Sequence, residues 1–114
     1  MTNAQPATWP AYGASVCRSI IRDMPHLPIT VHYGQGSVST RYVGNRTIRL
    51  TPTLTEVTAQ QWERRAHGAW WPTGPLLRAP YPSIDGIGST AFPAAVRTAV
   101  ETLAVDLDTR RAAA

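Results

Sequence analysis

The sequence contains no lysine, and all eleven of its basic residues are arginine. It has one cysteine, Cys17, so a disulfide framework within the chain is excluded. No apolar run approaches the roughly 18 residues of a membrane span, and the first residues lack the basic start and apolar stretch of a signal peptide. We therefore expect a cytoplasmic protein with no membrane partner and with Cys17 as a buried structural thiol.

The absence of lysine has three explanations. GC-rich coding displaces lysine in favour of arginine and alanine, and the many alanine, proline and threonine residues agree with it. Selection of arginine for bidentate contacts with phosphate or carboxylate groups is the second, and escape from lysine-directed tagging for degradation is the third. Coding is favoured, which suggests a high-GC bacterium, or a phage or other mobile element within one.

The length of 114 residues predicts one domain. A hydrophobic content of 43% with 16% charged residues is typical of globular proteins rather than disordered ones. Residues 1–10 carry two prolines and no periodicity, so we expect a flexible N-terminal leader followed by a single domain over 11–111.

Apolar residues recur every four positions over 11–24, which predicts an amphipathic helix that Pro25 ends. From residue 29 to 51, apolar and polar side chains alternate between glycine-bearing turns. This alternation predicts three strands, at 29–33, 37–43 and 46–51, joined as an antiparallel meander. Because one face of the meander is apolar, helices must cover it.

Thr58 and Gln61 have the spacing of a capping box, which predicts a second helix running to Pro72, with Trp62 and Trp70 facing the core. A proline- and glycine-rich loop then spans 72–90 and a closing helix begins near Phe92. The expected fold is α+β, in the order α-β-β-β-α-loop-α, with a three-stranded meander packed by helices on one face.

Glu63 and His67 stand four residues apart, so on a helix they would share one face and could bind a divalent metal such as zinc, with Asp85 as a further ligand. A strand followed by a helix that carries this pair resembles the order of small zincin metallopeptidases over residues 29–75. That family has the motif His-Glu-x-x-His, whereas here Glu63 stands at the first ligand and Arg64 at the general base. Arginine cannot take a proton from metal-bound water, so the resemblance implies a degenerate motif. A surface pair without metal is the favoured alternative.

Arginines on the expected strands and helix form a candidate nucleic-acid surface, because arginines near aromatic side chains can contact phosphates and stack on bases. These residues are Arg41, Arg46, Arg49, Arg64 and Arg65. The formal charge of +4 is modest and no recognition motif is present. A solvated sheet face or an acidic protein partner remain alternatives.

Trp71 is one residue further round the expected helix than Trp70 and cannot share its direction. It is therefore a candidate anchor, either for the proline-rich loop, which would cover it and is favoured, or for a protein partner. Tyr81 and Arg78 lie near it in the sequence and complete the candidate partner site.

No Ser-His-Asp or Cys-His arrangement can be drawn from the three histidines. We therefore expect a small non-enzymatic binding or accessory protein with no cofactor, acting through protein–protein contacts. The aromatic residues gather at the expected loop rather than on the sheet, which favours this interpretation. The alternatives are a nucleic-acid-binding protein that uses the arginine-rich face, and a zincin-like metal hydrolase that would need zinc.

Overall fold

A computed structural model describes residues 5–33, 36–39, 45–83 and 90–113. Its elements, in chain order, are α1 (Gln5–Asp23), β1 (Ile29–Tyr33), β2 (Gly36–Ser39), β3 (Arg46–Pro52), β4 (Glu56–Arg64), the 3-10 helix η1 (Ala66–Gly68), β5 (Trp70–Pro80) and α2 (Ala91–Ala113). The predicted α+β class is confirmed. The predicted strand count is wrong, because the described sheet has five strands.

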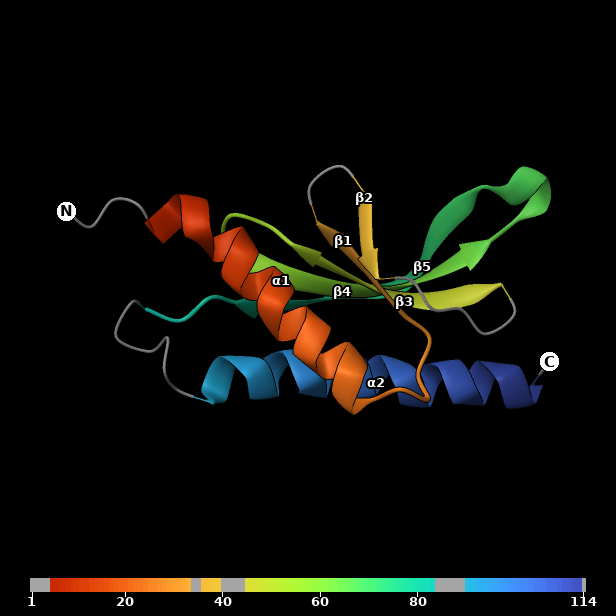
Figure 1. The fold of residues 1–114 in the computed structure, drawn as a ribbon. Helices are drawn as coiled ribbons and strands as arrows, with labels where there is room; N and C mark the ends of the chain where they lie inside the picture. Colours follow the sequence, from red (N-terminus) through yellow and green to blue (C-terminus); the bar gives the residue numbers. More distant parts are fainter. Residues whose placement is uncertain (1–4, 34–35, 40–44, 84–89, 114) are drawn as a thin grey trace.

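The molecule has two layers, a sheet in the order β2-β1-β3-β4-β5 and a helical layer on one of its faces (Figure 1). α2 runs beneath the sheet along its length, and α1 crosses diagonally in front of it (Figure 1). α1 packs on β1 and β3, whereas α2 packs on β4 and β5. The prediction that helices cover one face is thus confirmed, and the other face has no helix among the described residues.

The predicted meander over 29–51 is wrong in its strand order. β1 pairs antiparallel with β2, but it pairs parallel with β3, so that Ile29 lies beside Ile48 and Val31 beside Leu50. The antiparallel meander is formed instead by β3, β4 and β5. Alternation along a strand shows which side chains are buried, but it carries no information on which strand lies next to it.

The predicted helix from Thr58 to Pro72 is also wrong, since this segment contains β4, η1 and the start of β5. In β4 every second residue is buried, namely Val57, Ala59 and Gln61. Trp62 and Trp70, which we expected in the core, are only half-buried. Trp62 shares one face of β4 with Arg64, and Trp70 lies opposite Arg64 on β5, so both tryptophans lie on the face opposite the buried residues of β4.

β5 occupies residues 72–80 of the segment 72–90 that we predicted as a loop, and it carries Pro72, Pro75 and Pro80. It is an edge strand, with β4 as its one neighbour in the described sheet. Proline is tolerated at an edge because its missing N–H need not serve a further strand. α1 begins at Gln5, so six of the ten residues assigned to the leader are helical, and the other four lie outside the described residues.

The core lies between the sheet and the two helices. Its largest fully buried side chains come from both layers and include Ile29, Val31, Ile48, Leu50, Val57, Val96, Val100 and Leu103. At one end the core is closed by aromatic rings, with Trp9 stacked on Tyr81 at 5.0 Å between ring centroids and Phe92 at 5.3 Å from Tyr81. No described helix is both long and apolar enough to span a membrane.

Cys17 is confirmed as a buried thiol, with 0% of its surface exposed. Burial raises the pKa of Cys17 to about 12, with the nearby Arg18 charge acting in the opposite direction. Since the thiolate is the reactive form, we expect no reaction of the native protein with a thiol-specific disulfide reagent at pH 8, and complete reaction in denaturant. A Ser15→Cys variant in a Cys17→Ala background is the matched control, because Ser15 is exposed on the same helix and should react at once. Rapid labelling of native Cys17 would contradict its placement.

Candidate functional site

The β4–β5 hairpin extends past the body of the sheet, and its tip curls away from the helical layer (Figure 1). The Arg65 N–H donates to the Ala69 carbonyl at 2.8 Å, and the Gly68 N–H donates to the Arg65 carbonyl at 3.1 Å. Within this turn His67 has φ of 70° and Gly68 has φ of 78°. Two consecutive left-handed residues reverse the chain sharply, and histidine is one of the side chains that tolerates this conformation. We call residues 64–71 the hairpin tip.

Three arginines on this hairpin and its neighbour β3 lie over tryptophan rings. The distances from guanidinium carbon to ring centroid are 3.5 Å for Arg49 on Trp62, 5.7 Å for Arg64 on Trp70 and 5.9 Å for Arg65 on Trp71. All three are within the roughly 6 Å over which a cation is attracted to an aromatic face. We call these six residues the Arg–Trp surface.

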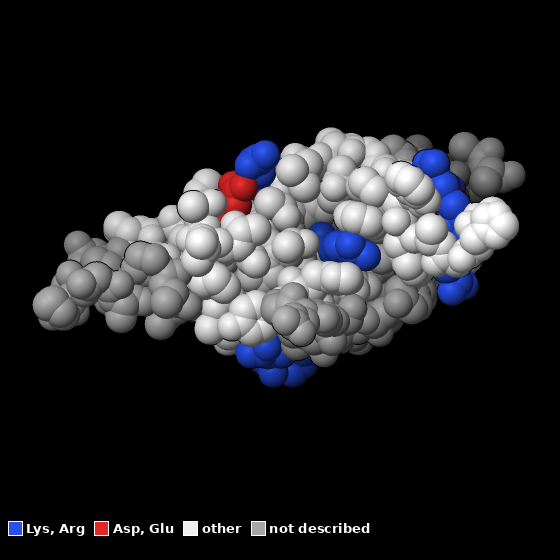
Figure 2. All heavy atoms as spheres, turned by 90° about the horizontal axis from the view of Figure 1, so that it is seen from above, with Lys and Arg blue, Asp and Glu red and all other residues white. Residues whose placement is uncertain are grey.

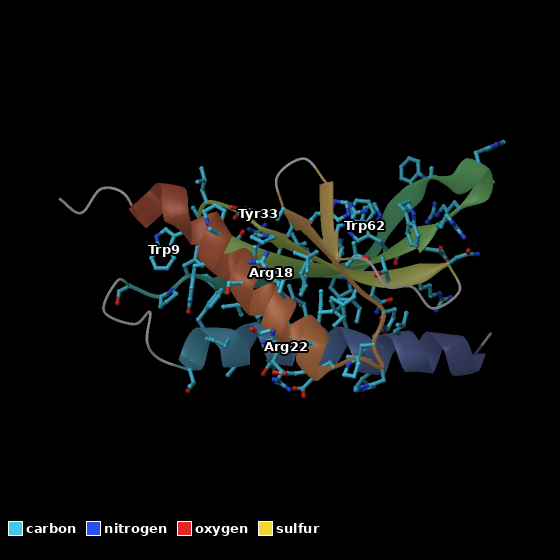
Figure 3. All side chains as sticks on the ribbon, viewed as in Figure 1. Trp9, Arg18, Arg22, Tyr33 and Trp62 are labelled. Atoms are coloured by element: carbon cyan, nitrogen blue, oxygen red, sulfur yellow. The ribbon has the colours of Figure 1, made fainter. Side chains whose placement is uncertain are left out.

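Strand register explains how the pairs form. Arg49 lies opposite Gln60 on β4, so Trp62 is its diagonal neighbour on the same face. Arg64 lies directly opposite Trp70 on β5. Trp62 points to the side of the sheet away from the helices (Figure 3). Side chains at even spacing along a strand share a face, so Arg64 lies on the same side, opposite the buried Val57, Ala59 and Gln61. Trp71 lies opposite Glu63 and therefore on the other side of the hairpin, so the Arg–Trp surface extends over both sides of this two-stranded ribbon.

Positive charge dominates this region. Glu63 is its acidic residue, and its two carboxylate oxygens lie 3.8 Å from Arg46 Nε and 3.8 Å from Arg65 Nε. Four arginines against one glutamate give a local net charge of +3, in a chain whose formal net charge is +4. The face away from the helices shows blue basic groups in separate places, and red acidic atoms where they touch a basic group (Figure 2).

The charge of Arg49 also reaches β1, where Thr30 is its register partner. Burial and, secondly, the positive charge of Arg49 lower the pKa of His32. His32 is thus favoured in its neutral form beside the Arg–Trp surface, and the positive potential there comes from arginine.

The structure places four of the five arginines that we assigned to a nucleic-acid surface around the hairpin, with Arg49 and Arg64 on the side of Trp62 and Arg46 on the side of Glu63. The fourth, Arg65, lies in the hairpin tip and contacts Glu63. The fifth, Arg41, lies outside the described residues. Sequence reasoning missed Trp62 and Trp70, because it assigned both to the core. The signal was present in the order Gln60, Trp62, Arg64, which alternates as a strand does.

The three residues of the candidate partner site are not brought together. Trp71 is the second residue of β5, whereas Tyr81 follows its last residue, about 30 Å away for an extended strand of this length. The Tyr81 hydroxyl donates to the Thr53 carbonyl at 2.8 Å, and Arg78 Nη1 lies 2.6 Å from Glu56 Oε2. Trp71 is 52% exposed, so the expectation that the loop covers it is wrong.

The helical face that was to carry Glu63 and His67 does not exist, because Glu63 is in β4 and His67 is in the turn after it. Asp85, the further candidate ligand, lies outside the described residues. Within the part of the chain that the structure describes, no three His, Cys, Asp or Glu side chains are grouped as a metal site would require. The strand–helix order on which the zincin resemblance depends is therefore wrong.

The chain matches no protein-family model, and neither the curated proteins nor the solved structures include one with significant similarity to it.

Proposed function

We propose that the protein binds nucleic acid through the Arg–Trp surface and does not catalyse a reaction there. The observation that carries this proposal is the set of three arginines, each held over a tryptophan, on one projecting hairpin and the adjoining strand. The site would need no cofactor, since its groups act by charge and by stacking.

Stacking prepares an arginine for phosphate binding. When the flat face of a guanidinium rests on a ring, its N–H groups still point outward in its own plane. Arg64, which is exposed, is the arginine of the set best placed to use its N–H groups in this way, whereas Arg49, at 3.5 Å from the Trp62 centroid, is half-buried with a buried Nε. Holding the side chain in place reduces the conformational entropy that is lost on binding. The arrangement therefore suits repeated contacts with a phosphate backbone.

The expectation of a protein partner depended on aromatic residues that lie apart from the arginines. In the structure the tryptophans of the hairpin alternate with arginines on paired strands, which favours nucleic acid. A protein partner remains the second candidate on one observation, the exposure of Trp71 (52%) and Leu76 (42%) along the edge strand β5.

Salt dependence of binding tests the proposal. A fluorescently labelled 20-nucleotide DNA, measured by anisotropy between 50 and 500 mM salt, should bind with log K falling linearly against log salt concentration. Arg64→Gln and Arg65→Gln should each flatten that slope by about 0.7–0.9, because each removes one phosphate contact and its released counterion. Both side chains are exposed, so neither substitution should unfold the protein.

Arg22→Gln is the matched control, since it removes the same charge from an exposed position on α1, across the molecule from the hairpin (Figure 3). It should leave the slope within error of the unmodified protein. If Arg22→Gln weakens binding as much as Arg64→Gln, the attraction comes from net charge and the site is misplaced. No DNA or RNA binding even at 50 mM salt would overturn the proposal and favour the protein partner.

A further inference from the structure

We infer that the nucleic acid bound by this surface is single-stranded DNA, with an unpaired base stacked on Trp71. This inference rests on the proposed function and adds the form of the ligand and the residue that selects it.

Trp71 is the tryptophan of the Arg–Trp surface that is most available to a ligand. It is 52% exposed, whereas Trp62 and Trp70 are half-buried on the hairpin. The Arg49 guanidinium lies 3.5 Å from the centroid of Trp62 and so covers that ring closely, but the Arg65 guanidinium is 5.9 Å from the centroid of Trp71. Trp71 therefore keeps ring surface free for a second flat group.

A flat aromatic surface of this kind distinguishes single strands from duplexes. In a duplex each base is stacked between its neighbours and presents only its edge to a protein. In a single strand the face of a base can stack on an aromatic side chain, and every base offers such a face. An exposed indole on a projecting hairpin therefore favours the binding of a single strand over a duplex.

The hairpin tip has no amide or hydroxyl side chain that could read base edges in a groove. Its turn consists of Ala66, His67 and Gly68 followed by Ala69. Asn45, a neighbouring amide, already accepts from Arg64 Nη2 at 3.3 Å. A surface with phosphate-binding arginines and a stacking ring, but few edge-reading amides, predicts binding that tolerates many sequences.

The same shortage of polar groups leads us to DNA rather than RNA. Discrimination in favour of RNA requires contacts to the ribose 2′-hydroxyl from donors or acceptors beside the stacked base. On the same face of the hairpin as Trp71 lie Thr73, two residues along β5, and Glu63, its register partner. The Thr73 hydroxyl donates to the Gln61 carbonyl at 3.5 Å, and the Glu63 carboxylate lies 3.8 Å from Arg65 Nε. The groups beside Trp71 that could contact a ribose hydroxyl are thus already engaged within the protein.

The test compares four ligands of equal length at one salt concentration: a 20-nucleotide mixed-sequence DNA strand, its duplex, the RNA of the same sequence and oligo-dT. We expect both DNA strands to bind at least about 10-fold more tightly than the duplex, and the RNA to bind no more tightly than the DNA. Trp71→Leu should weaken single-strand binding about 10- to 100-fold and leave the salt slope unchanged, because it removes stacking and no charge. Trp71→Phe should retain most of the affinity, since it keeps an aromatic face.

The binding results that would contradict the inference differ from those that would contradict the proposed function. Equal or tighter duplex binding would overturn it and leave the proposed function standing, whereas tenfold tighter RNA binding would overturn the choice of DNA. If Trp71→Leu binds as the unmodified protein does, Trp71 is not the stacking residue. Absence of binding to all four ligands would overturn the proposed function itself. Unchanged melting temperatures of the two variants would exclude unfolding as the cause of any loss.

Discussion

Replacement of Gln61 by glutamate should lower the free energy of unfolding at pH 7 by about 3–5 kcal/mol, the cost of an uncompensated buried charge. Gln61 is 1% exposed and joins the sheet to α2. Its side-chain Nε2 donates to the Leu103 carbonyl at 3.2 Å and to Asp106 Oδ2 at 2.7 Å. A carboxylate at this position would lose both donated bonds and face two acceptors.

The loss should depend on pH with a defined sign. Burial and the Asp106 carboxylate would both raise the pKa of the introduced carboxyl above the usual glutamate value of about 4.3. The unfolded chain then releases its proton at lower pH than the folded chain does, so the deficit relative to the unmodified protein grows as pH rises above about 4.3. It should level off above the raised pKa. Urea unfolding of both proteins from pH 4 to pH 8 measures this.

Gln61→Met is the control, because it removes the same hydrogen bonds with similar volume and no charge. We expect a deficit of about 1–2 kcal/mol that does not change with pH between 4 and 8. Equal stability of Gln61→Glu and the unmodified protein at pH 7 would show that Gln61 is not buried against α2.

Gly13→Ala should destabilise the protein by about 1–3 kcal/mol, although alanine in a helix interior is ordinarily more stable than glycine by about 1 kcal/mol. A Cβ at this position would lie 2.5 Å from the Tyr81 hydroxyl oxygen and 3.0 Å from Val57 Cγ2. The Tyr81 ring cannot move away cheaply, because its hydroxyl donates to the Thr53 carbonyl and its face stacks on Trp9. α1 therefore approaches the end of β5 more closely than any side chain at position 13 allows.

A double-mutant cycle identifies the cause of that loss. Tyr81→Phe removes the closest oxygen, so Gly13→Ala should cost less in that background than in the unmodified protein. Ser15→Ala, at an exposed position of the same helix, should be neutral or slightly stabilising. Thermal and urea unfolding of the four proteins in the cycle give the coupling directly. A stabilising Gly13→Ala would mean that α1 does not pack against Tyr81 as described.

Short-range patterns in the sequence determined much of the fold. The four-residue recurrence that ends at Met24 predicted α1, and the alternation in 29–33 and 46–51 predicted β1 and β3 with their buried faces. These patterns are local, because a side chain's face depends only on the period of its own element. The same alternation placed Arg49 away from the core, as the structure has it.

Tertiary structure decided what local patterns leave open. The segment from Thr58 to Trp70 satisfies helical spacing at several positions, yet it pairs with β3 and β5, since strand pairing depends on partners far along the chain. Pairing set the order of the sheet and placed β5 at an edge, where its prolines are tolerated. It also brought Trp62, Trp70 and Trp71 beside arginines from other positions. The amino-acid sequence therefore determined which residues could form a binding surface, and long-range pairing alone decided which of them meet.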